Sequence, residues 1–217
     1  MAEQLDMFAE NPEPSSPEKT DQSGSRILYF DLETKKGSSD VGGWGNIHLM
    51  GLAVGVVWDS RDEKYFSYLE KDADQLVDKL KSADLVVGFN VIGFDYTVLQ
   101  PYAKHRNIDL QDIPTFDMLT DVHKKLKHRL ALNNLAEYTL GAKKSADGLV
   151  SLQWYKEYLA GDAKKLDKIV EYCIQDVEIT RDLFLFGQKH GLVKYSSKTK
   201  GPAELKVDWS FDQVIPK

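Results

Sequence analysis

Apolar residues gather into short runs that predict β-strands in the first half of the chain. Two runs, residues 26–33 (RILYFDLE) and 48–59 (HLMGLAVGVVWD), are almost continuously apolar, which is typical of strands covered on both faces. Further strands are predicted over residues 64–70, 84–90 and 115–119.

Apolar residues at helical spacing predict α-helices, most of them in the second half. One helix is expected over residues 72–83, and another starts within residues 94–106. The remaining predicted elements are helices over residues 130–141, 152–159 and 163–189 and a β-hairpin over residues 192–209. Strands followed by alternating elements predict an α/β fold with a mixed β-sheet.

The N-terminal segment differs in composition from the rest. Residues 9–25 are rich in Pro, Glu and Ser, and such a segment cannot bury enough apolar surface to fold. We expect a disordered tail over residues 1–25 and one folded domain over residues 26–217.

Charge and cysteine content leave several classes of function open. The net charge is −6, but residues 1–25 carry six acids and one lysine, so the body is close to neutral. A polyanionic substrate is therefore neither excluded nor favoured. The single Cys173 excludes an internal disulfide, and neither a membrane span nor a secretory signal is found, so a cytoplasmic protein is expected.

Two carboxylates stand where the first predicted strand ends. Because side chains alternate along a strand, Asp31 and Glu33 point to the same face while Leu32 points to the other. They are either solvated at the strand end or hold a metal ion.

Two later segments carry further acids. In GFNVIGFDYTVL, Asn90 and Asp95 stand at a switch from strand to helix, where Asp95 could also cap the helix. In EYCIQDVEITRDL, Tyr172 and Asp176 are spaced i, i+4 on one face of a helix, either as an exposed pair or as part of a site. Nearby apolar positions are expected to be core: Ile169, Cys173, Val177 and Leu183.

Together these three motifs resemble the DEDD 3′→5′ exonuclease superfamily, which has a ribonuclease H-like fold. The order is D-x-E at a first strand end, N-x3-F-D at a strand-to-helix junction, and Y-x3-D in a late helix. The tyrosine of the third motif is similar to that of the DEDDy branch. The resemblance covers residues from about 26 to 185.

The resemblance implies that Asp31, Glu33, Asp95 and Asp176 bind two divalent ions and that Tyr172 orients the attacking water. Two such ions supply a nucleophile and relieve the charge on the leaving oxygen in phosphodiester hydrolysis. Oxygen ligands without a Cys or His cluster favour Mg²⁺ or Mn²⁺ over Zn²⁺.

Several other residues are candidates for substrate binding, each with an ordinary structural alternative. Asn90 either holds the substrate or is a structural amide, and Phe94 belongs to the same motif. Trp44, in a glycine-rich stretch, could stack on a base, but a core anchor is the favoured interpretation. Lys124 and Lys125 open a basic run that ends at His128 and Arg129, and this run either follows a phosphate backbone or is a solvated face. Asp117 resembles a secondary acidic position of such exonucleases, with a turn or cap role as the ordinary alternative.

A short motif lies in the tail. Gln4-Leu5-Asp6-Met7-Phe8 resembles the peptide by which bacterial proteins bind the sliding clamp, with Met7 in place of the usual leucine. A flexible linker after such a peptide would tether an enzyme to the clamp and raise its effective concentration.

Together, the family resemblance and the clamp-like peptide imply a metal-dependent 3′→5′ exonuclease that acts on single-stranded or frayed 3′ DNA ends and is tethered to the replication sliding clamp. The spacing of the residues alone indicates only a site of four carboxylates. One alternative is a 3′→5′ exoribonuclease, since the same site serves both sugars. Another is a non-catalytic adaptor that binds the clamp and nucleic acid, although a pure binder has no need of four clustered carboxylates.

Overall fold

The computed structural model describes residues 24–142, 149–197 and 201–215. The expected clamp-binding peptide, Gln4 to Phe8, and nearly all of the expected disordered tail lie outside these residues. Among the described helices, none combines the length and the apolar character needed to cross a membrane.

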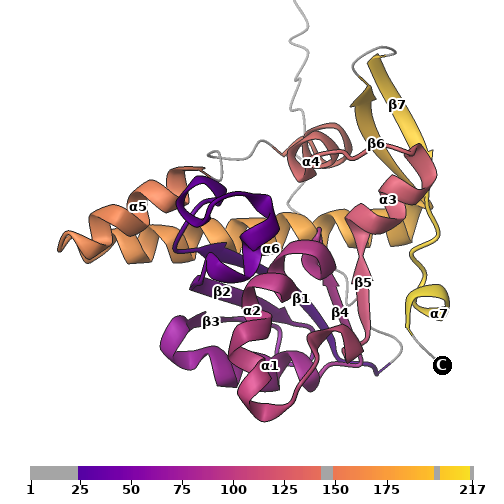
Figure 1. The fold of residues 1–217 in the computed structure, drawn as a ribbon. Helices are drawn as coiled ribbons and strands as arrows, with labels where there is room; N and C mark the ends of the chain where they lie inside the picture. Colours follow the sequence, from indigo (N-terminus) through magenta and orange to yellow (C-terminus); the bar gives the residue numbers. More distant parts are fainter. Residues whose placement is uncertain (1–23, 143–148, 198–200, 216–217) are drawn as a thin grey trace, which may run out of the picture.

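A five-stranded mixed sheet forms the centre of the fold, as predicted (Figure 1). Its order is β3-β2-β1-β4-β5; β1 runs antiparallel to β2 and parallel to β4, β2 and β3 are antiparallel, and β4 and β5 are parallel. The strands are β1 (Ile27–Thr34), β2 (Leu52–Asp59), β3 (Lys64–Leu69), β4 (Leu85–Gly88) and β5 (Thr115–Asp117).

Several predicted strands are shorter than expected, and in two of them a local structure explains the difference. β2 begins at Leu52 instead of His48, because residues Trp44–Leu49 form a 3-10 helix and Gly51 adopts a positive φ of 71° before the strand. β5 ends at Asp117, whose side chain caps a helix that the sequence did not predict, α3 (Met118–Leu126). In both places a local turn or cap ends the extended conformation earlier than the apolar pattern does.

The other helices largely follow the predicted ranges. They are α1 (Ala73–Lys81), α2 (Tyr96–Ala103), α4 (Leu132–Leu140), α5 (Leu149–Leu159), α6 (Lys164–His190) and the short α7 (Phe211–Val214). The N-terminal end of α6 and the adjacent α5 extend past the edge of the sheet (Figure 1).

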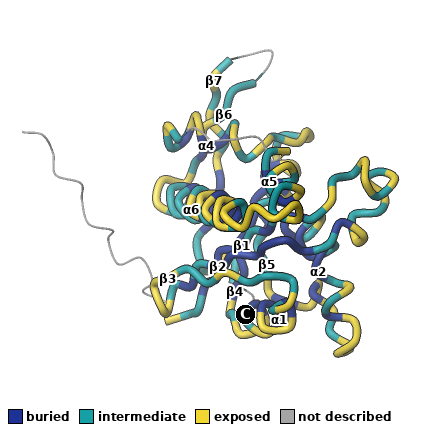
Figure 2. Tube along the Cα trace, turned by 90° about the vertical axis from the view of Figure 1, so that its left-hand side faces the viewer, coloured by how far each residue is buried: buried dark blue, intermediate teal, exposed yellow. Residues whose placement is uncertain are grey.

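Both faces of the sheet are covered, which explains the nearly continuous apolar runs. Alternate residues of β1 enter two cores: Ile27 and Tyr29 pack with residues of α6, and Leu28, Phe30 and Leu32 pack with residues of α1 and α2. Figure 2 shows the buried strands between α6 on one side and α1 and α2 on the other. This layering fixes the face toward which each side chain of β1 points.

The predicted C-terminal hairpin is confirmed as β6 (Leu192–Ser197) and β7 (Gly201–Lys206). Side chains of α4 bind the outer edge of β6: Asn134 exchanges hydrogen bonds with the backbone of Ser196, and Thr139 does so with the backbone of Lys194. α4 thus replaces a neighbouring strand and satisfies backbone groups that would otherwise form an open edge.

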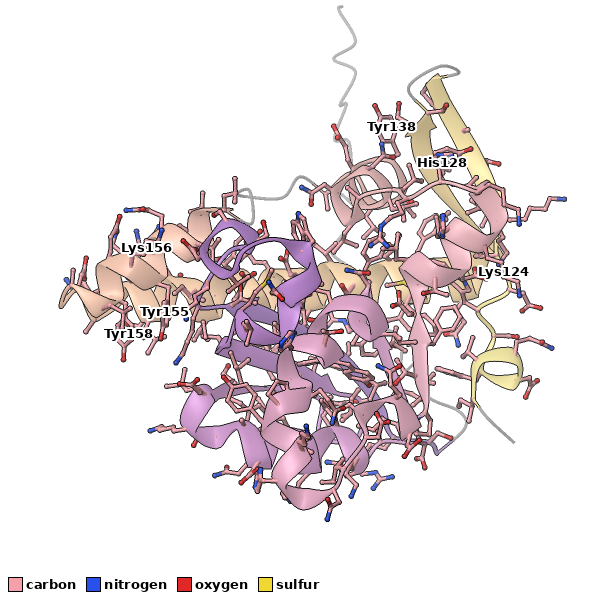
Figure 3. All side chains as sticks on the ribbon, in the orientation of Figure 1. Lys124, His128, Tyr138, Tyr155, Lys156 and Tyr158 are labelled. Atoms are coloured by element: carbon pink, nitrogen blue, oxygen red, sulfur yellow. The ribbon has the colours of Figure 1, made fainter. Side chains whose placement is uncertain are left out.

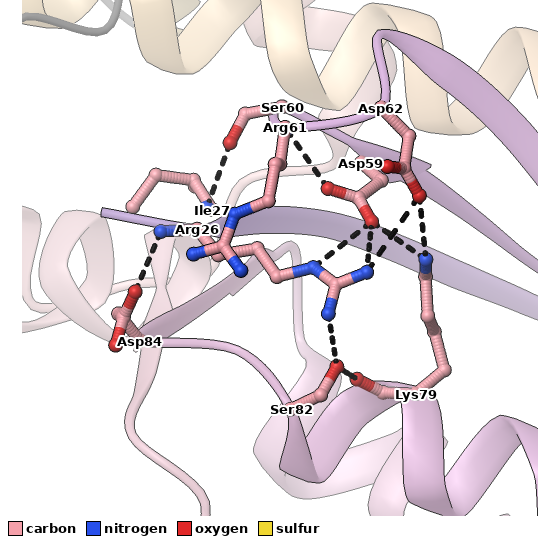
Figure 4. Close-up of polar contacts among 9 residues, drawn as sticks. All are labelled: Arg26, Ile27, Asp59, Ser60, Arg61, Asp62, Lys79, Ser82 and Asp84. Carbon is pink, nitrogen blue, oxygen red and sulfur yellow. Dashed lines mark hydrogen bonds and ion pairs between the residues drawn. The ribbon is translucent and has the colours of Figure 1, made fainter. Parts of the chain in front are cut away.

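An ion-pair cluster fixes the start of β1, at the opposite end from the acidic motif (Figure 4). The fully buried Asp59 carboxylate accepts hydrogen bonds from Arg26 at 2.6 Å and from Lys79 at 2.6 Å. Burial raises the pKa of Asp59, but the hydrogen bonds from the two cations outweigh this effect and hold the pKa well below its ordinary value. The cluster therefore joins β1, β2 and α1 through one charged carboxylate.

Candidate active site

The end of β1 presents two carboxylates toward α6. In the pairing of β1 with β2, Asp31 lies opposite Val56 and Glu33 lies opposite Val54. Leu32, between the two acids, is buried on the other face of the sheet, in the core formed with α1 and α2. Pairing with β4 covers only residues 27–29 of β1, because β4 ends at Gly88 and its chain turns away. The two acidic residues therefore lie at a half-open edge of the sheet, where they are only partly buried.

Helix α6 brings the third carboxylate to the same place. The expected core residues Ile169, Cys173, Val177 and Leu183 are all fully buried, which confirms that interpretation of the helix. The Cys173 thiol lies 3.4 Å from the backbone oxygen of Asp31, so α6 crosses directly over this part of β1.

Three carboxylates converge as a result. One oxygen from each of Asp31, Glu33 and Asp176 lies within 4.8 Å of the others, and Asp176 is only 3% exposed. Hard oxygen donors at this spacing fit a cation such as Mg²⁺ or Mn²⁺, which prefers carboxylate ligands. Among the described residues, this group is the one in which acidic or other metal-binding side chains are gathered tightly enough for such a role.

The fourth predicted ligand, Asp95, lies beside this group but is not one of the three. It is 3% exposed, and its Oδ1 accepts a hydrogen bond from the backbone N–H of Leu32 at 3.1 Å. Burial, followed by the negative charges of Asp117 and Glu33, raises the pKa of Asp95 well above its ordinary value. The second motif is thus brought to β1, between the two acids of the first motif.

The same four carboxylates act on the Cys173 thiol. Burial raises its pKa well above the ordinary value, and the charges of Asp31, Glu33, Asp176 and Asp95 raise it further. All four acids therefore lie near the one buried Cys173 thiol. A divalent cation is the ligand that such a group of acids favours.

A strained turn places Asp95. Asn90 has a positive φ of 68° and is followed by one π-helical turn over Val91–Asp95, which continues into α2. Gly88 is required just before this turn, since a Cβ there would lie 2.8 Å from Val91 Cβ and 3.2 Å from the backbone oxygen of Phe30. Turns of the π type recur at functional sites.

Asp117 organises this turn and caps α3, in agreement with the alternative of a capping residue. Its carboxylate accepts hydrogen bonds from the backbone N–H groups of Asn90 (2.9 Å), Ile92 (3.1 Å), Leu119 (3.0 Å) and Thr120 (3.3 Å). One buried side chain therefore holds the second motif against the start of α3.

Tyr172 is buried on α6, one turn before Asp176. It is 3% exposed, and its ring meets that of Trp154 on α5 edge to face, with a centroid distance of 6.1 Å. The alternative of an exposed Tyr–Asp pair on a solvated helix face is therefore excluded.

Ser151 contacts the acidic group but was not found from the sequence. It is 2% exposed on α5, and its hydroxyl donates a hydrogen bond of 2.5 Å to Glu33 Oε2. A serine near the start of a predicted helix resembles an ordinary cap residue, so no sequence signal distinguished it.

A cavity of about 430 Å³ opens beside the carboxylates. Asp31 and Asp176 line one part of it, and Asn90 and the exposed Arg129 line another. Arg129 Nη2 donates to Asn90 Oδ1 at 2.8 Å. The remaining lining residues are Phe89, Leu119, Leu130, Ala131 and Leu132. The cavity is thus lined by acidic, cationic and apolar side chains.

The basic run divides into residues at this cavity and residues away from it. Arg129 lines the cavity, whereas Lys125 is bonded to Asp121 within α3 at 2.6 Å. Lys124 is exposed and lies at the outer edge of the molecule in Figure 3. Neither Lys124 nor Lys125 lines the cavity, so the structure offers no contact that supports their predicted role in substrate binding.

Trp44 is not a core residue, so the favoured sequence interpretation was wrong. Its side chain is 68% exposed, and its ring centroid lies 6.4 Å from that of the half-buried Phe94. Gly42 and Gly43, just before Trp44, adopt positive φ angles that allow the chain to turn sharply, and Trp44 then opens a 3-10 segment in which no residue is buried.

Comparisons with known proteins agree with this fold. The chain is similar to the structure of the family B DNA polymerase from the hyperthermophilic archaeon Pyrobaculum calidifontis, with 21% identity and a TM-score of 0.55. The similarity covers 80% of this chain and 26% of the polymerase chain, so this chain spans about a quarter of that protein. No match was found among curated proteins. The family model of the RNase H superfamily matches residues 28–185, well over half of the 217 residues, and the chain therefore belongs to the RNase H superfamily.

Proposed function

We propose that the protein is a metal-dependent 3′→5′ exonuclease of the DEDDy type that acts on single-stranded or frayed 3′ ends of DNA. The observation that carries this proposal is the convergence of Asp31, Glu33 and Asp176, within 4.8 Å, from two segments far apart in the sequence. Membership of the RNase H superfamily supports a nuclease. Similarity to part of a DNA polymerase supports DNA as the substrate.

The carboxylates have defined roles in this proposal. Asp31, Glu33 and Asp176, with Asp95 beside them, hold two Mg²⁺ or Mn²⁺ ions. Bound there, such ions activate water and neutralise charge that develops on the phosphodiester. The protein contributes a rigid arrangement, since β1 and α6 are both packed into the core on either side of the site.

Tyr172 serves as a positioning group. A phenol with an ordinary pKa of about 10 is a poor general base at neutral pH. It therefore orients the attacking water by hydrogen bonding more readily than it removes a proton from that water. Its burial against Trp154 fixes the ring and supports this role.

The cavity beside the acids accommodates the end of the substrate strand. Arg129 provides a cation for a backbone phosphate, and Asn90, which holds Arg129, provides a polar group at the same wall. Trp44 and Phe94 form an aromatic pair, in which the exposed Trp44 ring is available to stack on an unpaired base. Stacking of this kind requires a single-stranded or frayed end.

The proposal includes a tether to the bacterial sliding clamp through Gln4, Leu5, Asp6, Met7 and Phe8. Its support is the sequence of that peptide and the linker-like residues that follow it. A peptide of residues 1–10 should bind a bacterial clamp, and replacing Gln4 and Phe8 by alanine should abolish binding. If the unmodified peptide does not bind the clamp, the tether is excluded while the nuclease proposal stands.

The nuclease proposal is tested by digesting 5′-labelled DNA and RNA oligomers with Mg²⁺, Mn²⁺ or EDTA. The wild type should shorten DNA stepwise from the 3′ end in either metal and not in EDTA, and Asp31→Ala and Asp176→Asn should lose this activity. Asp167→Asn, on the exposed side of the same helix, is the matched control and should remain active. Preferential digestion of RNA would instead indicate an exoribonuclease, and binding without cleavage would indicate an adaptor.

A further inference from the structure

Ser151 joins helix α5 to the acidic group. Its hydroxyl donates to Glu33 Oε2 at 2.5 Å across a separation of 118 residues, and the side chain is almost completely buried. A hydrogen bond from a hydroxyl to an ionised carboxylate is charge-assisted and stronger than one between neutral groups. It therefore constrains one particular oxygen of Glu33.

Other contacts hold α5 against both elements that carry the carboxylates. On the side of α6, Trp154 packs against Tyr172. On the side of β1, Leu152 lies against the chain that follows the strand, since a Cβ on Gly37 would be 2.9 Å from Leu152 Cδ1. Ser151 thus projects from a fixed helix and does not depend on a loose loop for its position.

We propose that Ser151 is a positioning residue for the metal site. Its hydrogen bond to Oε2 of Glu33 restricts rotation of that carboxylate and so holds it where one of its oxygens lies within 4.8 Å of an oxygen from each of Asp31 and Asp176. The inference rests on the proposed function, because it takes the acidic group to be a divalent-metal site.

The bond acts at two stages. Before a cation binds, it offsets part of the repulsion among the three carboxylates, since a donor at one oxygen stabilises the charged form. When a cation binds, Glu33 is already ordered, so less side-chain entropy is lost. Hydrogen-bond partners of metal ligands typically change metal affinity by about 10–100-fold when they are removed.

Calorimetric titration of the full chain with Mn²⁺ tests this role without relying on activity. Ser151→Ala should weaken Mn²⁺ binding by about tenfold or more, and Ser151→Thr, which keeps the hydroxyl, should restore most of the affinity. Thr139→Val is the matched control, because it removes a buried hydroxyl whose hydrogen bonds go to the backbone of Lys194 and not to the acidic group. It should lower the melting temperature in EDTA and leave Mn²⁺ affinity unchanged.

A purely structural role for Ser151 predicts a different pattern. In that case Ser151→Ala would lower the melting temperature in EDTA while binding Mn²⁺ within twofold of the wild type, and the inference would be wrong. Ser151→Cys, a weaker donor of similar size, provides the same comparison if the alanine variant does not fold; wild-type affinity in it would likewise overturn the proposal. If the wild type itself shows no Mn²⁺ binding that Asp31→Ala removes, the metal site and the proposed function fail together, which is distinguishable from a failure confined to Ser151.

Discussion

Replacing Arg129 by glutamine removes the cation that lines the cavity beside Asp31 and Asp176. If this guanidinium binds one phosphate of single-stranded DNA, the variant makes one phosphate contact fewer, and its affinity for DNA depends less steeply on the salt concentration. The contribution of one contact to the slope of log K against log salt is about 0.7. Between about 50 and 200 mM salt it amounts to a factor of about 2.6 in affinity.

The absolute loss of affinity is also bounded. Arg129 is exposed, and a charge contact at an exposed position is worth up to about 1 kcal/mol, which corresponds to about fivefold in affinity. A loss of about fivefold at the lower salt concentration should therefore shrink to about twofold at the higher one. Fluorescence anisotropy of a labelled single-stranded oligomer in EDTA measures both quantities without cleavage.

Two matched variants isolate the charge. Arg129→Lys keeps the cation but loses the Nη2–H that donates to Asn90 Oδ1, so its slope should match the wild type. Lys124→Gln removes a cation of the same basic run that does not line the cavity, and it should also keep the wild-type slope. The reasoning is refuted if Arg129→Gln retains the wild-type slope, or if Lys124→Gln lowers it equally.

Two further predictions concern stability, both measured by urea unfolding. Asp59→Asn should cost about 3–5 kcal/mol at neutral pH, because it removes the charge of a fully buried carboxylate that pairs with the partly buried Arg26 and Lys79. The pKa of Asp59 is lower in the folded state than in the unfolded state. Its contribution to the free energy of unfolding is therefore complete above the unfolded pKa of about 3.9 and is lost as the pH falls below that value. A loss of stability in Asp59→Asn that stays equally large in acid would contradict this. Gly187→Ala should cost about 1–3 kcal/mol, since a Cβ would lie 2.2 Å from Trp209 Cε3. Gly45→Ala, with open space around its Cα, should stay within about 0.5 kcal/mol of the wild type, and an equal loss in both variants would exclude the packing explanation.

Much of the fold and three of the four acids could be predicted because they depend on local periodicity. The alternation of a strand places Asp31 and Glu33 on one face. The amphipathic pattern of α6 identifies its buried side, and Asp176 lies on that side with Cys173 and Val177. Once the core is formed, these two periodicities bring the carboxylates together.

The remaining features depend on tertiary contacts that leave no periodic signal. Ser151 reaches Glu33 only because α5 packs beside β1 and α6. Asp95 is placed by a π-helical turn and by the four backbone bonds that Asp117 accepts, and neither can be seen in a pattern of apolar residues. Trp44 was expected to be a core anchor, but it follows two glycines with positive φ angles and its side chain is exposed.

The central claim is that three acidic side chains, delivered by β1 and α6, form a binding site for divalent cations. Anomalous diffraction from crystals of the protein grown with Mn²⁺ tests it most directly. The account predicts a Mn²⁺ peak in contact with carboxylate oxygens of Asp31, Glu33 and Asp176. Mn²⁺ peaks only elsewhere on the molecule, with these three carboxylates bonded to protein groups alone, would contradict it.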